Sequence, residues 1–92
     1  MNVTLFHNFQ HNLKLLLEHA DRSHAAVAEQ AGVSAVHLSN VIRGQQTNPK
    51  IETCEELAIA AGIADFGLTS DAIFYSPQRF ARIVKENLQP TA

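Results

Sequence analysis

The sequence has little of what secreted, membrane-spanning or strongly basic proteins require. Its 92 residues include one cysteine, Cys54, so no disulfide can form within the chain and a reducing compartment is expected. No apolar run approaches the roughly 18 residues that a membrane span needs, and the N-terminal stretch lacks a basic segment followed by an uninterrupted apolar one. These absences predict a cytoplasmic protein that makes no use of a membrane.

Positive charge is scarce as well. The chain has 7 Lys and Arg against 9 Asp and Glu, a net charge of -2, and phosphate affinity comes mostly from lysine and arginine. Composition alone therefore does not favour a nucleic-acid binder. The charge is weakly segregated, however, because residues 22–50 hold three bases (Arg22, Arg43 and Lys50) against one acid, Glu29, whereas the rest of the chain is acidic.

The remaining composition, 46% hydrophobic and 17% charged, is that of an ordinary globular chain, and its length suits one domain over residues 1–92. Apolar residues recur at intervals of three and four, the period of a helix with one buried face. No strand pattern, internal repeat or low-complexity segment competes with them. The sequence predicts an all-α bundle of five to six helices.

Residues that favour helix starts and ends stand at the boundaries of the periodic segments. Ser23 and Ser34 are the expected N-caps of two short helices, which Gly32 and Gly44 close. For the later helices the expected starts are Asn48 with Pro49, Thr69 or Ser70, and Ser76 with Pro77.

The two short helices fit a helix-turn-helix at about residues 23–44. A three-residue turn makes them cross steeply, and Ala28 is small enough for the contact point. Gly32 reverses the chain, Val33 fills the angle between the helices, and Leu38 and Val41 seat the second helix on the first. The second helix is then held along one face only, and its other face is free to enter a DNA major groove.

From Asn12 to Ile63 the sequence resembles the lambda-repressor/Cro-type (XRE-like) helix-turn-helix regulators. The likeness is carried by VAEQAGVS..HLSNVIRG, similar to the family's two helices and glycine turn, and by NPKIETCEELAIAAGI, similar to its fourth helix. The resemblance implies a lambda-repressor-like bundle with an extra C-terminal helix. It also implies a regulator, most often a repressor, that binds double-stranded operator DNA through residues 35–43.

The resemblance assigns DNA contacts residue by residue. Base edges would be read by Ala35, Val36 and Asn40. The DNA backbone would be contacted by His24, Ser34, His37, Ser39, Arg43, Gln45, Thr47 and Asn48. His24 stands where the family commonly has glutamine, and the reading positions lack a long polar side chain.

The first two predicted base-contacting residues are apolar, which limits the base edges that they can recognise. Ala35 and Val36 cannot hydrogen-bond a base edge, but they can pack against the thymine methyl group, while Asn40 can pair with adenine N6 and N7. The expected site is rich in A·T pairs. The alternative is that Val36 is an isolated surface valine without a partner, and that His24 and His37 are ordinary exposed or partly packed histidines.

One short helix touches few bases, so binding as a homodimer to a two-fold site, with half-sites roughly 34 Å apart, is expected. The expected dimerisation segment is 70–89, which offers the apolar side chains of Phe74, Tyr75, Phe80, Ile83 and Val84. The alternative for these residues is packing onto the first helix.

No other pattern points to chemistry. His7 and His11 are spaced to chelate a metal, but no third ligand is marked, so surface histidines are favoured. Cys54 falls on a buried helix face and is expected in the core. We expect no catalytic residue, metal or cofactor. The second function that fits is a protein-interaction module on the same fold, such as an antitoxin that holds a toxin, or an adaptor, and the acidic remainder of the chain favours it.

Overall fold

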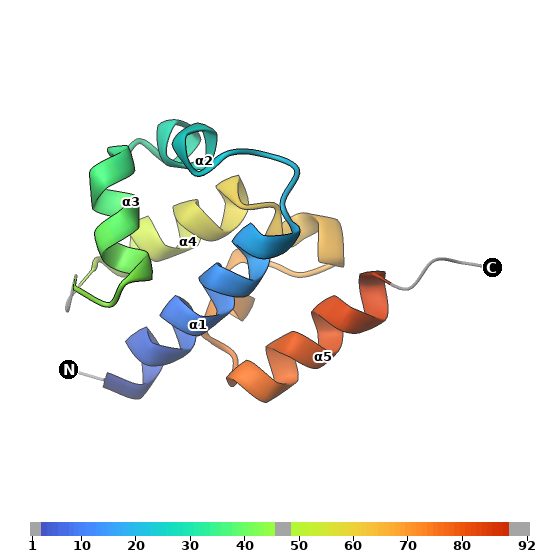
Figure 1. Cartoon of the computed structure of the whole chain (residues 1–92). Helices are drawn as coiled ribbons and strands as arrows, with labels where there is room; N and C mark the ends of the chain where they lie inside the picture. Colours follow the sequence, from blue (N-terminus) through green and yellow to red (C-terminus); the bar gives the residue numbers. More distant parts are fainter. Residues whose placement is uncertain (1–2, 46–48, 89–92) are drawn as a thin grey trace.

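The computed structural model describes residues 3–45 and 49–88 (Figure 1). That part of the chain forms five α-helices and two short 3-10 helices, without a strand. In chain order they are α1 (Val3–His19), α2 (His24–Ala31), α3 (Ala35–Ile42), α4 (Ile51–Ala60), η1 (Ile63–Phe66), η2 (Ser70–Phe74) and α5 (Pro77–Leu88). The predicted all-α fold is confirmed. None of these helices combines the length and the apolar character needed to cross a membrane.

Three of the predicted helix starts are confirmed by their capping hydrogen bonds. The Ser23 hydroxyl accepts from the backbone N–H of Ala26 at 3.1 Å, and the Ser34 hydroxyl accepts from that of His37 at 3.0 Å. The Ser76 hydroxyl lies 3.4 Å from the N–H of Arg79 at the start of α5. Each serine thus satisfies a first-turn amide that has no partner within its helix.

One of the other predicted starts was wrong, and one was right in position but not in helix type. The fourth helix does not begin at Pro49: α4 begins at Ile51, and Lys50 is its N-cap in an extended conformation with no side-chain cap. Pro49 is buried instead, so it packs before the helix begins, and Asn48 lies outside the described residues. The predicted fifth helix is the 3-10 helix η2, and Thr69 is its N-cap as predicted, although the Thr69 hydroxyl bonds the Asp71 carboxylate rather than a helix amide.

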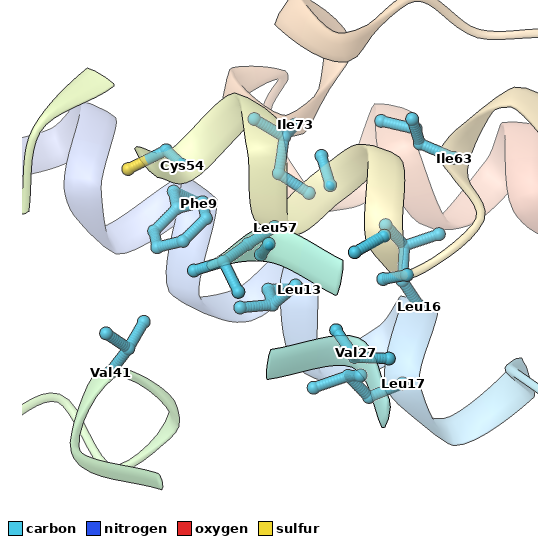
Figure 2. Close-up of a cluster of buried hydrophobic side chains, with 14 of the residues drawn as sticks. Phe9, Leu13, Leu16, Leu17, Val27, Val41, Cys54, Leu57, Ile63 and Ile73 are labelled. Carbon is cyan, nitrogen blue, oxygen red and sulfur yellow. The ribbon is translucent and has the colours of Figure 1, made fainter. Parts of the chain in front are cut away.

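The core gathers around α1, which runs through the middle of the bundle in Figure 1 and contacts α3, α4, η2 and α5. Its buried face carries Phe9, Leu13 and Leu16, which meet side chains from α2, α3 and α4 (Figure 2). Cys54 belongs to this cluster, as predicted, and burial raises the pKa of its thiol to about 12. The thiol therefore stays protonated and behaves as a small apolar side chain.

Phe80 and Val84 also lie in this core, with 0% and 1% of their surface exposed. They were predicted to offer apolar surface to a second chain, and this prediction was wrong, because α5 turns them inward where it packs against α1. Phe74, Tyr75 and Ile83 from the same segment are only half-buried.

Asn12 is a polar residue buried in the core. It is 1% exposed, and its side-chain amide donates to the backbone carbonyls of Ile73 at 3.0 Å and Tyr75 at 2.8 Å. These bonds fix the chain leaving η2 against α1 and set the point from which α5 begins. Both protons of the amide are used, so the buried group is satisfied.

Replacing Asn12 by alanine is expected to lower the free energy of unfolding by about 2 kcal/mol, because two carbonyls lose their donor in the interior. Urea denaturation measures the change. The control is Asn8→Ala, since Asn8 is half-buried and makes one longer bond, 3.3 Å, to the Phe74 carbonyl. Equal losses in the two variants would contradict the role given to Asn12.

Candidate nucleic-acid interface

The turn between α2 and α3 is closed by two backbone hydrogen bonds. The N–H of Gly32 donates to the carbonyl of Glu29 at 3.1 Å, and that of Val33 donates to the carbonyl of Ala28 at 2.9 Å. This double closure requires a left-handed residue, and Gly32 has φ 77° and ψ 24°. No atom lies within 4 Å of where its Cβ would be, so the glycine is needed for backbone conformation rather than for space.

Helix α3 is anchored along one face. Leu38 and Val41 are 0% and 2% exposed, while Val36, on the opposite face, is 71% exposed. Arg43, one residue beyond the helix, is exposed as well. We call the side of α3 that carries Ala35, Val36, Ser39, Asn40 and Arg43 its outward face. Figure 1 places α3 at one edge of the molecule.

The base-reading candidates differ in exposure. Ala35 and Val36 are exposed at the start of α3, whereas Asn40 is half-buried one turn further along. The Asn40 carbonyl accepts from the backbone N–H of Gln45 at 2.9 Å, so the chain after α3 is tied back to Asn40. The three residues thus lie together within two turns of one helix.

The backbone-contact candidates are more scattered. His24 is exposed at the first position of α2, Gln45 is exposed after α3, and His37 and Ser39 are half-buried. The Ser34 oxygen is occupied by its capping bond, which leaves its hydroxyl proton for other acceptors. Thr47 and Asn48 lie outside the described residues.

Gln10 holds the far end of α3, and sequence reasoning missed it. Its side-chain amide donates to the Ile42 carbonyl at 2.8 Å, across 32 residues of chain. Gly44, with φ 76°, passes so close that a Cβ there would lie 2.9 Å from Gln10 Nε2. The sequence offers no signal for this contact, because a glutamine on the polar side of an amphipathic helix normally faces solvent.

Arg22, one of the three bases of residues 22–50, is held at the C-terminus of α4. Its Nη1 donates to the Gln30 amide oxygen at 2.6 Å and to the Ala60 carbonyl at 2.9 Å. It therefore caps the C-terminus of α4, where a cation is favoured by the helix dipole. Arg43 and Lys50 are the remaining bases of residues 22–50, so the interface is less basic than the sequence count indicates.

Two further candidate groups are placed by the structure. Tyr75 was predicted for a dimer interface. The Arg79 guanidinium stacks on its ring, with the guanidinium carbon Cζ 4.1 Å from the ring centroid. The rings of His7 and His11 lie 5.3 Å apart on α1. Within residues 3–45 and 49–88, no three His, Cys, Asp or Glu side chains gather as a metal-binding group.

Comparison with models of protein families matches residues 13–64 to the helix-turn-helix family, in its XRE or lambda-repressor-like class. The match covers more than half of the chain and runs from the middle of α1 to η1, so it includes the whole α2–turn–α3 unit. No curated protein and no solved structure matches the chain.

Replacing Gly44 by alanine is expected to destabilise the fold more than Gly67→Ala does. Both glycines have positive φ, 76° and 72°, but only the Gly44 variant also presses a Cβ against Gln10, because no atom lies within 4 Å at Gly67. The backbone part costs about 1 kcal/mol in each. In a Gln10→Ala background the excess cost at Gly44, measured by urea denaturation, should disappear; strictly additive effects would contradict this contact.

Proposed function

We propose that this chain, which belongs to the helix-turn-helix family of lambda-repressor-like DNA-binding regulators, is a cytoplasmic transcriptional repressor that reads operator DNA with α3. The observation that carries the proposal is the anchoring of α3 by Leu38 and Val41 while Val36 is 71% exposed. A helix held in this way can enter the major groove with its outward face towards the bases.

Base reading falls to the first two turns of α3. Val36 and Ala35 present apolar surface, and the apolar feature of the major groove is the C5 methyl group of thymine. Asn40 carries an amide that pairs with adenine through one donor and one acceptor. We therefore infer a site in which A·T pairs occupy the contacted positions.

Phosphate contacts come from few charges. Arg43 stands at the end of α3, where its guanidinium can hold a phosphate with two parallel hydrogen bonds. The exposed His24 at the start of α2 and the exposed Gln45 after α3 add an imidazole and an amide that can hydrogen-bond a phosphate. With so few cations, the affinity should fall less steeply with salt than for a strongly basic DNA-binding protein.

Sequence-specific binding requires a dimer, because a single α3 touches too few bases to discriminate between sequences. Phe74 and Tyr75 precede α5 and Ile83 lies in its middle; all three are half-buried, so part of their apolar surface is uncovered. Two copies related by a two-fold axis would bury these side chains against each other and present two α3 helices to one operator.

A second candidate, a protein-interaction module such as an antitoxin, is favoured by the outer face of α4. There Ile51 and Ile59 are 51% and 54% exposed beside the exposed Glu52 and Glu56. Such an acidic face with two apolar side chains suits a basic protein partner better than DNA.

Selection of bound sequences from a random pool of DNA duplexes tests the proposed contacts of Asn40 and Arg43. Asn40→Ala is expected to remove the preference at one base position, worth about 1–3 kcal/mol of discrimination. Arg43→Ala is expected to weaken binding to all sequences alike. The matched controls are Asn87→Ala and Arg82→Ala, which change the same residue types at exposed positions of α5. A wild-type pool without enrichment would instead favour the interaction module.

Oligomeric state tests the dimer, by sedimentation velocity at concentrations that saturate DNA. Ile83→Lys is expected to convert a dimer into a monomer, because it places a charge in the proposed apolar contact, and binding to a single half-site should persist. Ile59→Lys, at an exposed isoleucine of α4, should leave the dimer intact. A wild-type chain that sediments as a monomer when free and when bound would refute dimerisation.

A further inference from the structure

Acidic side chains gather on one side of α4. This helix of 10 residues carries three of the nine acids of the chain, Glu52, Glu55 and Glu56, and no base. Successive residues of an α-helix are turned by about 100°, so these glutamates fall within about 140° of the helix circumference together with Ile51 and Ile59. The two isoleucines are 51% and 54% exposed, Glu52 and Glu56 are exposed, and Glu55 is half-buried. We call these five residues the acidic face of α4.

The other side of α4 is held in the core, where Cys54 and Leu57 have no exposed surface. The bases that adjoin this helix lie at its two ends. Lys50 is its N-cap, and Arg22 donates to the Ala60 carbonyl in its last turn. The acidic face therefore combines negative charge with exposed apolar surface.

Helix α5 has the opposite charge. It carries three of the seven bases of the chain, Arg79, Arg82 and Lys85, against one acid, Glu86, and all four side chains are exposed. The Arg79 guanidinium is stacked on the Tyr75 ring. Arg82 and Lys85 are thus the bases of α5 that remain for a partner.

Arg82 and Lys85 lie on a side of α5 that the core does not use, because Phe80, which is 0% exposed, is turned about 160° from Arg82. They are three residues apart, so they project from neighbouring turns about 4.5 Å apart along the axis. Leu88, one turn after Lys85, is 45% exposed. We call Arg82, Lys85 and Leu88 the basic face of α5.

The two faces match in charge and in apolar content. Glu52 and Glu55 are also three residues apart, so the axial step between these acids equals the step between Arg82 and Lys85. The faces cannot meet within one chain, however, because each is the exposed side of a helix whose other side is buried in the same core. They can meet only between two copies.

We propose that the basic face of α5 in one copy docks on the acidic face of α4 in a second copy of this chain. The contact joins unlike faces, so each copy can engage one neighbour through α4 and another through α5. It differs from the proposed two-fold contact, because Ile83 is turned about 100° from Arg82. The inference goes beyond the proposed function: it requires no DNA, and it makes the chain itself the basic partner of α4.

The contact is weak. Two faces of short helices bury less than the roughly 1,200 Å² of a stable interface, and exposed ion pairs contribute little each. Association through it is therefore expected at low salt and at protein concentrations on the order of 0.1–1 mM. These concentrations are well above those of a DNA-binding assay.

Charge reversal tests the contact, by sedimentation velocity over this concentration range at about 50 mM salt. Glu56→Lys and Arg82→Glu are each expected to weaken association about tenfold, because each turns an attraction across the contact into a repulsion. An equimolar mixture of the two variants is expected to associate as the wild type does. In the mixture, the unchanged α4 of one variant meets the unchanged α5 of the other, and the two reversed faces also attract each other.

The matched controls are Lys14→Glu and Glu18→Lys, which make the same charge changes at exposed positions of α1, outside both faces. Each should change association by much less, and mixing them should restore nothing. Ile83→Lys removes the proposed two-fold contact and should leave this association in place. Urea denaturation checks that each variant is folded, and Glu52→Lys with Lys85→Glu gives a second pair on the same faces.

A mixture of Glu56→Lys and Arg82→Glu that associates as weakly as either variant would overturn the contact. Equal effects of the α1 controls would overturn it too, since net charge would then be the cause. A wild-type chain that stays unassociated at these concentrations has the same consequence and leaves the acidic face to a protein of different sequence. None of these results decides whether α3 reads DNA, which the selection of bound sequences tests separately.

Discussion

Burial of one face of α1 is the constraint on which the rest of this structure depends. Phe9, Leu13 and Leu16 are at most 1% exposed, and they bring α3, α4, η2 and α5 to one helix. The two helices of the helix-turn-helix are 8 residues each, too short to be stable alone. Their shape therefore comes from packing, and α3 can keep a free face because its other face is held so completely.

Two side-chain amides on α1 add hydrogen bonds to the contacts made by its apolar face. Asn12 binds the two carbonyls at the exit of η2, and Gln10 binds the last carbonyl of α3. The last carbonyls of a helix have no hydrogen-bond partner within that helix. A side-chain amide from a neighbouring helix can donate to them, and this bond fixes the helix end relative to its neighbour. The same helix thus fixes both the start of α5 and the end of α3.

Charge is distributed by the fold rather than along the chain. The acidic side chains Glu52 and Glu56 lie on the outer side of α4, and Arg22 is drawn to the C-terminus of that helix. Lys14, remote from the basic centre in sequence, stands beside His24 and the end of α3. The net charge of -2 therefore does not describe the charge of any one face of the molecule.

The sequence by itself determined the local features. Helical periodicity, the capping serines and the glycine turns predicted the helices and the exposed face of α3, because each signal acts within a few residues. Only the tertiary structure decided which face of each helix is buried and which segments meet. It buried Phe80 and Val84, moved the start of α4 past a buried Pro49, and paired Gln10 with Ile42. Those outcomes depend on contacts between distant segments, and no local pattern records which segments will meet.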